Sequence, residues 1–70
     1  MWTEGKINGY EYFIKHFDEG SEFGINGGRI SKLAIRDQKG RWVVNYDRGW
    51  DIRPSKEVKP IYDELIKKYN

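Results

Sequence analysis

The chain has 70 residues, with 13 Lys and Arg against 11 Asp and Glu, a net charge of +2, and no cysteine. A chain this short buries only about 60% of its unfolded surface, and without cysteine neither disulfides nor cysteine-bound metals can stabilise it. Three Trp, five Tyr and three Phe argue against disorder. No apolar run approaches the roughly 18 residues of a membrane span and no leader pattern is present, so we expect a cytoplasmic protein without a membrane partner.

The first two predicted strands, residues 2–7 and 10–17, flank Asn8-Gly9. Asn-Gly between two strand-like runs is typical of a type I′ hairpin turn, in which both central residues have positive φ. The second strand carries aromatic side chains on both faces, with Tyr12 on one and Phe13 on the other. The pattern therefore predicts a hairpin but not which of its faces is buried.

A glycine-dense stretch, residues 20–28, precedes the third predicted strand. Gly24, Gly27 and Gly28 fall within five positions, and because each glycine raises the entropy cost of folding, we expect them to form a specific turn or bulge. The backbone N–H groups of such a turn can also cradle an anion beside Arg29. A nucleotide-hydrolysing phosphate loop is excluded, since the Gly-Lys-Ser/Thr ending and the βαβ setting are missing.

The third and fourth predicted strands are residues 29–37 and 41–47, joined by a short turn that contains Gly40. Alternation along the fourth strand places Trp42 on the same face as Val44. One face of these two strands is clearly the more apolar. The sequence thus predicts an antiparallel meander of four strands.

Apolar residues near the end of the chain recur with helical spacing, which predicts an amphipathic helix over residues 55–69. The stripe consists of Val58, Ile61, Tyr62, Leu65, Ile66 and Tyr69. Ser55 is the expected N-cap, and Asp63 is expected to pair with Lys67 one turn later. The fold class is therefore α+β, a four-stranded antiparallel meander in residues 1–53 followed by this helix, in a single domain spanning residues 1–70.

Charge is distributed unevenly along the chain. Residues 1–28 have a balance of −3, whereas residues 29–53 have a balance of +4 and include two of the three tryptophans. Guanidinium groups pair with phosphates and aromatic rings stack on bases, so this composition suits a nucleic-acid surface. The candidate nucleic-acid-binding residues are Arg29, Lys32, Arg36, Arg41, Arg48 and Trp50. The plainer alternative is that these cations only keep the sheet soluble. Separately, the acidic first hairpin offers a second, negative surface for a protein partner.

Other candidate chemistry is weak. Asp47 and Asp51 lie close together in a loop, which suits a hard cation such as Mg²⁺. The same loop fits a structural clasp in which Arg48 pairs with an aspartate and Trp50 packs on the helix. His16 is the only histidine and has no serine or cysteine placed for nucleophilic catalysis. We expect no cofactor and no metal, and we favour a non-enzymatic role over a weak metal-dependent nuclease or nickase.

The segments at residues 20–25, 28–33 and 45–51 resemble a family of small uncharacterised proteins of Gram-positive gut bacteria, their phages and mobile elements. The resemblance covers nearly the whole chain, from Trp2 through the C-terminal helix, and implies a genomic habitat but no reaction and no functional residues. The inferred ββββα order is also similar to single-stranded-DNA-binding coactivator-type folds, in which a curved four-stranded sheet and a following helix form dimers. This second likeness is one of topology alone.

These observations lead to two hypotheses of different class. The first is a phage or mobile-element accessory protein that binds nucleic acid through a basic-aromatic sheet surface and counters a host defence nuclease, in the manner of an anti-CRISPR protein. The second is a protein-binding inhibitor of a host complex without DNA affinity of its own. Unprotected strand edges and a free sheet face predict a homodimer or an assembly built from dimers.

Overall fold

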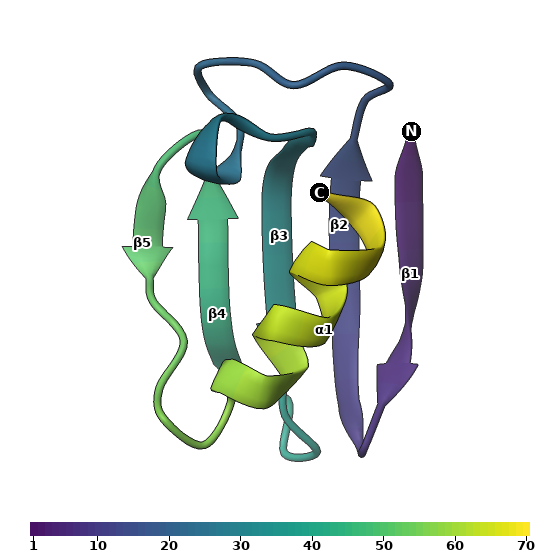
Figure 1. The fold of residues 1–70 in the computed structure, drawn as a ribbon. Coiled ribbons are helices and arrows are strands. Elements are labelled where there is room, and N and C mark those ends of the chain that lie inside the picture. Colours follow the sequence, from purple (N-terminus) through teal and green to yellow (C-terminus); the bar gives the residue numbers. More distant parts are fainter.

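The chain forms an antiparallel sheet of five strands with one helix across a single face, as the computed structural model describes for residues 1–70 (Figure 1). The strands lie in the sheet in chain order, each beside its sequence neighbour. The elements are β1 Trp2–Ile7, β2 Tyr10–His16, the 3-10 turn η1 Ile25–Gly27, β3 Ile30–Arg36, β4 Trp42–Asp47, β5 Trp50–Ile52 and α1 Lys59–Tyr69. The expected α+β class and meander order are confirmed. No helix has the length and apolar character needed to span a membrane.

The number of strands differs from the sequence prediction. After β4 the backbone of Arg48 takes φ +59° and reverses the chain, so that β5 pairs with β4 and brings Trp50 opposite Tyr46. A strand of three residues is too short to display a period-2 pattern, and the segment reads as a loop from sequence. The expectation of four strands was therefore wrong, and the sheet has one more edge strand.

The helix begins later than predicted, at Lys59 rather than at residue 55. Ser55 belongs to a turn before the helix, in which its hydroxyl accepts a long hydrogen bond of 3.4 Å from the Val58 N–H. The predicted apolar stripe is confirmed, since four of its six members are buried and the other two pack against the core. The expected Asp63–Lys67 pair is absent, because Asp63 is held by Lys59 at 2.7 Å.

The first hairpin has the predicted turn. Asn8 has φ +50° and Gly9 has φ +84°, the two positive angles that a type I′ turn requires. Further along the same hairpin, Tyr12 lies opposite Gly5, and a Cβ placed on Gly5 would stand 2.6 Å from the Tyr12 hydroxyl oxygen. Glycine at this position therefore lets the Tyr12 ring lie flat over the edge strand β1.

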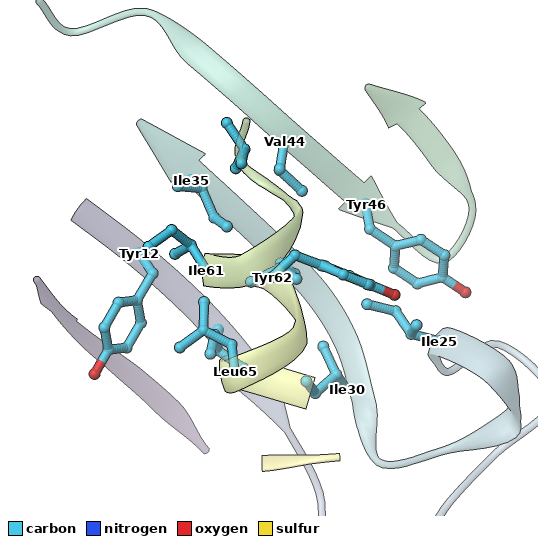
Figure 2. Packing of buried hydrophobic residues seen from close by; sticks show 12 residues of the cluster. Tyr12, Ile25, Ile30, Ile35, Val44, Tyr46, Ile61, Tyr62 and Leu65 are labelled. Atoms are coloured by element: carbon cyan, nitrogen blue, oxygen red, sulfur yellow. The ribbon is translucent and has the colours of Figure 1, made fainter. Parts of the chain in front are cut away.

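The core lies between α1 and the sheet face that the helix covers (Figure 2). Its buried members are Tyr12, Ile14, Ile25, Ile30, Leu33, Ile35, Val44, Tyr46, Val58, Ile61, Tyr62 and Leu65. All of the strand residues among them come from β2, β3 and β4, the three central strands, over which the helix passes obliquely (Figure 1). Because a single helix covers a single face, the other face of the same strands is left open.

A register shift between β3 and β4 decides the side on which Trp42 lies. Ile35 is opposite Val44, but Arg36, the next residue of β3, is opposite Trp42, so Val43 is an extra residue in β4. An extra residue of this kind moves the side chains beyond it to the other face. The expectation that Trp42 shares a face with Val44 was therefore wrong.

The glycine-dense stretch forms the specific turn that the sequence predicted. Asn26 and Gly27, in η1, have φ +53° and φ +71°. The turn is tied to the end of the helix by Asn70, whose Oδ1 accepts from the Ile30 N–H at 2.9 Å and whose Nδ2 donates to the Ile25 carbonyl at 3.0 Å. The loop above the sheet is thus fixed by a side chain from the far end of the chain.

Candidate nucleic-acid interface

The face of the sheet away from the helix carries three ladders of directly paired residues across β1 to β4. We call these residues the open face: Trp2, Lys15, Lys32 and Asp47 in the first ladder, Glu4, Phe13, Ala34 and Asn45 in the second, and Lys6, Glu11, Arg36 and Trp42 in the third. None of the twelve is buried. The open face therefore combines exposed aromatic rings with charged side chains of both signs, four of them cationic.

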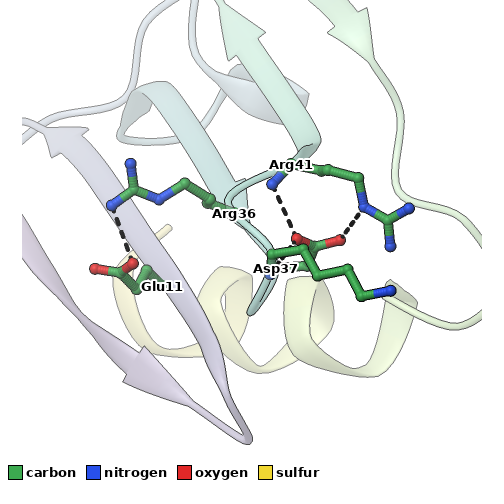
Figure 3. Close-up of polar contacts among 5 residues, drawn as sticks. Glu11, Arg36, Asp37 and Arg41 are labelled. Atoms are coloured by element: carbon green, nitrogen blue, oxygen red, sulfur yellow. Dashed lines mark hydrogen bonds and ion pairs between the residues drawn. The ribbon is translucent and has the colours of Figure 1, made fainter.

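Arg36 lies in the third ladder, with its guanidinium against two aromatic rings that also contact each other. Its guanidinium carbon is 5.4 Å from the centre of the Phe13 ring and 5.3 Å from that of Trp42, and the two rings meet edge to face at 5.9 Å. The same guanidinium donates to the Glu11 carboxylate at 3.0 Å (Figure 3). Cation–π contacts and the ion pair hold Arg36 and the rings in one arrangement at the surface.

A second cationic and aromatic group lies at the other end of the face. The Lys15 ammonium is 6.0 Å from the ring centre of Trp2 and 5.7 Å from that of Phe17. Lys32, opposite Lys15 in the first ladder, pairs loosely with Asp47 at 3.7 Å. Trp2 is 61% exposed and Trp42 is 48% exposed, so both ends of the face present an indole to solvent.

Between these groups the open face has a shallow apolar depression of about 190 Å³. Ala34, the smallest side chain of the central ladder, is among its lining residues, with Trp2 and Phe13 from β1 and β2 and Asn45 from β4. Lys32 and Asp47 also line it. The depression can accept a flat apolar group such as a base, with a cation at its border.

Two of the six residues that the sequence singled out, Lys32 and Arg36, lie on the open face. Arg41 does not, because it follows the turn between β3 and β4 and its Nε donates to Asp37 at 2.8 Å (Figure 3). The backbone N–H of Arg41, together with the N–H of Lys39 and the Arg41 side chain, holds the pKa of the Asp37 carboxyl below its usual value. Arg41 thus has a structural task in this turn.

The other three candidates lie elsewhere. Arg29 is in the loop before β3 and makes no ion pair, and Arg48 stacks on Phe23 with its guanidinium carbon 4.4 Å from the ring centre. Trp50 lies on the helix side of the sheet, edge to face with Tyr46 at 5.1 Å and tilted against Tyr62 at 5.6 Å. The expected packing of Trp50 on the helix is confirmed, whereas Arg48 contacts a ring and not an aspartate.

Four residues of the open face were not among the candidates that the sequence suggested. Trp2, Phe13 and Lys15 belong to the first hairpin, which the charge count marked as acidic, and Trp42 was assigned to the other side. The period-2 pattern of β1 and β2, aligned through the Asn8-Gly9 turn, already places Trp2 beside Lys15. That alignment was the available signal for these three residues. No comparable signal marks the register shift at Val43, which decides the side of Trp42.

Other candidate chemistry finds little support in the arrangement. No group of three or more His, Asp or Glu side chains lies together in a way that could hold a metal ion. His16 shares a hydrogen bond of 3.0 Å with the Thr3 hydroxyl and lies against Tyr69, with ring centres 5.4 Å apart. Its contacts are those of a side chain packed at the border of the core.

A family model described as a domain of unknown function (DUF7678) matches residues 1–70. Searches of curated proteins and of solved structures gave no match.

Proposed function

The chain belongs to this DUF7678 family, and since that membership brings no activity with it, we propose from the surface itself that the protein binds single-stranded nucleic acid through the open face. The observation that carries the proposal is a row of rings on one uncovered sheet face, with Trp2 and Trp42 exposed and Phe13 half-buried, each with a cation within about 6 Å of its ring centre. Base–aromatic stacking contributes about 1–3 kcal/mol per base and tolerates any base sequence.

The shape of the face favours a single strand over a duplex. A flat sheet surface with rings separated by a shallow depression can receive unstacked bases, whereas duplex DNA is read by a helix or a ribbon inserted into a groove. The bases of a duplex are stacked on one another and unavailable to Phe13 or Trp42. Single-stranded DNA or RNA therefore matches the open face better.

The cations of the face limit the strength of the proposed binding. Lys32 and Arg36 are each paired with a carboxylate, at 3.7 and 3.0 Å, so part of their charge is already neutralised. Lys15 and Lys6 make no ion pair with an acid. We therefore expect modest affinity that depends on stacking at least as much as on charge.

Trp42 takes the stacking role for which the sequence suggested Trp50. The direct test is fluorescence anisotropy of a labelled single-stranded oligothymidine against the purified protein and its Trp42→Ala variant at low salt. We expect the variant to bind about 5- to 150-fold more weakly, as the loss of one stacked base predicts. Trp50→Phe, which keeps an aromatic ring against Tyr46 and Tyr62, is the matched control and should bind as the natural chain does.

Two results would contradict the proposal. Equal losses for Trp42→Ala and Trp50→Phe would place binding elsewhere than on the open face. The protein can also be tested against single-stranded, duplex and supercoiled DNA and single-stranded RNA, at low salt with and without Mg²⁺. If it bound none of them, the proposal would be contradicted and a protein partner would be favoured instead. The exposed acidic loop with Asp18, Glu19 and Glu22, none of which is in an ion pair, is the surface that such a partner would use.

The resemblance to proteins of phages and mobile elements supplies the setting of this proposal. In that setting the protein is an accessory factor that covers single-stranded nucleic acid, and it counters a host defence nuclease by keeping that enzyme from its strand. A nuclease protection assay tests this extension, with oligothymidine digested in the presence of the protein or of Trp42→Ala. Protection by both proteins alike would overturn it.

We also infer that the protein forms a dimer through the free edge of β1, which leaves the open face accessible. β1 has six residues with one side unpaired, while the edge strand β5 has only three and offers little to pair with. Met1 and His16 exchange both of their backbone hydrogen bonds, so every second residue of β1, Glu4 among them, turns its N–H toward the free edge. Gel filtration with light scattering should give twice the chain mass at micromolar concentration, and Glu4→Pro, which removes one of these N–H donors, should give the monomer. A monomeric natural chain would contradict this inference.

A further inference from the structure

A hollow of about 360 Å³ lies at one end of the open face, where β2, β3, the glycine-dense loop and the β4–β5 turn meet. We call it the cationic hollow, and its lining residues are Lys15, Phe17, Ser21, Phe23, Ser31, Lys32 and Arg48. Three of the seven are cations, two carry hydroxyl groups, and none is acidic. At about 30 Å³ per water molecule, the hollow has room for an anion and part of its hydration shell.

The cations of the hollow are held by rings more than by acids. Lys15 lies over Phe17 at 5.7 Å and Arg48 lies over Phe23 at 4.4 Å, and neither is in an ion pair. A cation stacked on a ring leaves its N–H groups free to donate to an anion, whereas in a salt bridge those N–H groups already donate to the carboxylate. Only Lys32 has a carboxylate partner, Asp47, at the loose distance of 3.7 Å.

The backbone at Arg48 adds a second and independent indication. Arg48 has φ +59° although the next residue is Gly49, which has no positive φ. A side chain in this left-handed region costs about 1–2 kcal/mol, and strain of this kind gathers at binding sites, where a particular side chain is needed in a particular place. Here the strained position is the one that supplies the hollow with a guanidinium.

Ser31 brings a hydroxyl group to the same place. It is buried, and its Oγ is 3.4 Å from the Lys15 carbonyl oxygen, beyond the usual O–H···O range of about 2.5–3.0 Å. A hydroxyl so weakly engaged can turn toward an anion. Ser21 lies in the loop on the other side of the hollow and its hydroxyl makes no hydrogen bond within the chain.

We propose that the cationic hollow is a phosphate-binding site that receives a backbone phosphate of the bound nucleic-acid strand. The inference rests on the proposed function and deepens it. Lys32 lines both the hollow and the apolar depression, so the two adjoin. A phosphate in the hollow leaves the neighbouring base over Ala34, beside Phe13, and the strand then crosses the sheet from the loop end toward Arg36.

The first experiment is an NMR titration of the full chain with thymidine 5′-monophosphate, with thymidine and with inorganic phosphate. We expect the monophosphate to shift the backbone amides of Ser21, Ser31 and Arg48 saturably, inorganic phosphate to shift the same amides more weakly, and thymidine to leave them in place. If thymidine and its monophosphate gave the same shifts, or if the phosphate-dependent shifts lay outside the hollow, the site would be ruled out.

The variants that sharpen this test are Arg48→Gly and Lys15→Gln, with Lys67→Gln as the control. Lys67 is an exposed, unpaired lysine on the helix side, so its loss removes the same charge from the opposite surface. Glycine suits the positive φ at residue 48, so Arg48→Gly should fold at least as well as the natural chain. Each hollow variant should weaken monophosphate binding about tenfold, and the control should change it less than twofold. Equal effects for all three would overturn the proposal.

Salt dependence separates this inference from the proposed function. The one phosphate held in the hollow should contribute about −0.7 to the slope of the logarithm of the oligothymidine affinity against that of salt, because each neutralised phosphate of a single strand contributes about that much. If oligothymidine binds through the open face but the salt slope is unchanged in Arg48→Gly, the phosphate site in the hollow is contradicted and the proposed single-strand binding is retained. If the monophosphate binds in the hollow but oligothymidine does not bind, the proposed single-strand binding is contradicted and the phosphate site is retained.

Discussion

The two faces of the sheet are made from the same strands and differ in almost every property. On the helix side, Ile14 is opposite Leu33 and both are fully buried, whereas on the open face their neighbours Phe13 and Ala34 are opposite one another and touch solvent. The helix side has no charged residue among its buried side chains, and the open face has seven charged residues among twelve. In a domain this small, alternation along each strand separates the residues that stabilise the fold from those available for binding.

The largest expected effect distinguishes two adjacent residues of β3. Ile35→Ala removes a fully buried side chain next to Val44 and should lower the free energy of unfolding by about 2–5 kcal/mol. Arg36→Ala, one residue later on the open face, removes a half-exposed ion pair and should cost about 1 kcal/mol or less. Urea unfolding followed by tryptophan fluorescence measures both. Similar losses for the two variants would mean that both faces support the fold.

The next effect falls on binding alone. Phe13→Ala removes a ring that lines the apolar depression and supports Arg36, and we expect it to weaken oligothymidine binding by about 1–3 kcal/mol. Its thermal midpoint should stay close to that of the natural chain, since Phe13 lies outside the buried core. Anisotropy and a thermal melt of the same sample give the two readings. A variant that lost its stability while keeping its affinity would reverse the roles of the faces.

A smaller effect concerns Gly5 in the edge strand β1, over which the Tyr12 ring lies on the helix side. Gly5→Ala places a methyl group 2.6 Å from the Tyr12 hydroxyl oxygen, so the ring must move away from β1. The crowding costs about 1–3 kcal/mol, and the lower chain entropy of alanine returns about 0.5–1 kcal/mol, so a net loss of about 1 kcal/mol is expected. Urea unfolding measures the loss, and the ring resonances of Tyr12 should shift. Unchanged stability and resonances would show that the ring is not fixed over Gly5.

The smallest effect concerns the β3–β4 turn, which belongs to neither face. The pKa of Asp37 is lowered in the folded chain below 3.8, its value in a free side chain, chiefly by the Arg41 backbone N–H. The stabilisation from this carboxylate is therefore present above about pH 4 and is lost as the pH falls through the folded pKa. Asp37→Asn should show a smaller drop in thermal midpoint between pH 6 and pH 3 than the natural chain. An identical drop would remove Asp37 as a source of the pH dependence.

The sequence predicted those parts of the fold that depend on local patterns. Asn8-Gly9 fixed the first turn, and the stripe from Val58 to Tyr69 identified the helix and its buried side, because both signals lie within a few consecutive residues. The helix begins later than predicted because Ser55 lies in a separate turn, where its hydroxyl accepts from the Val58 N–H. A local signal thus gives the type of an element more reliably than its first residue.

The candidate site was predicted less well, because it depends on pairing between strands. The charge count along the chain selected Arg41, whose side chain pairs with Asp37 in the β3–β4 turn. It did not select Lys15, which lies opposite Lys32 in the β2–β3 register. The extra residue Val43 turns Trp42 outward, against the expectation, whereas Trp50 packs on the helix as in the expected clasp and not on the open face as in the nucleic-acid hypothesis. A single inserted residue reverses the side of everything beyond it, and its position leaves no mark in composition or periodicity.

The strictly sequential order of the strands bears on how the chain reaches this structure. Every strand pairs with the one before it, so the sheet can form one hairpin at a time, and the only long connection to close is residues 17–29 between β2 and β3. The 11-residue helix is too short to persist alone in water and must wait for the apolar surface that the strands provide. Asn70 can then join the helix end to the loop around Ile25 only when all else is in place. We therefore expect the first hairpin to acquire protection from hydrogen exchange early in refolding and the Ile30 amide, bound to Asn70, to acquire it last.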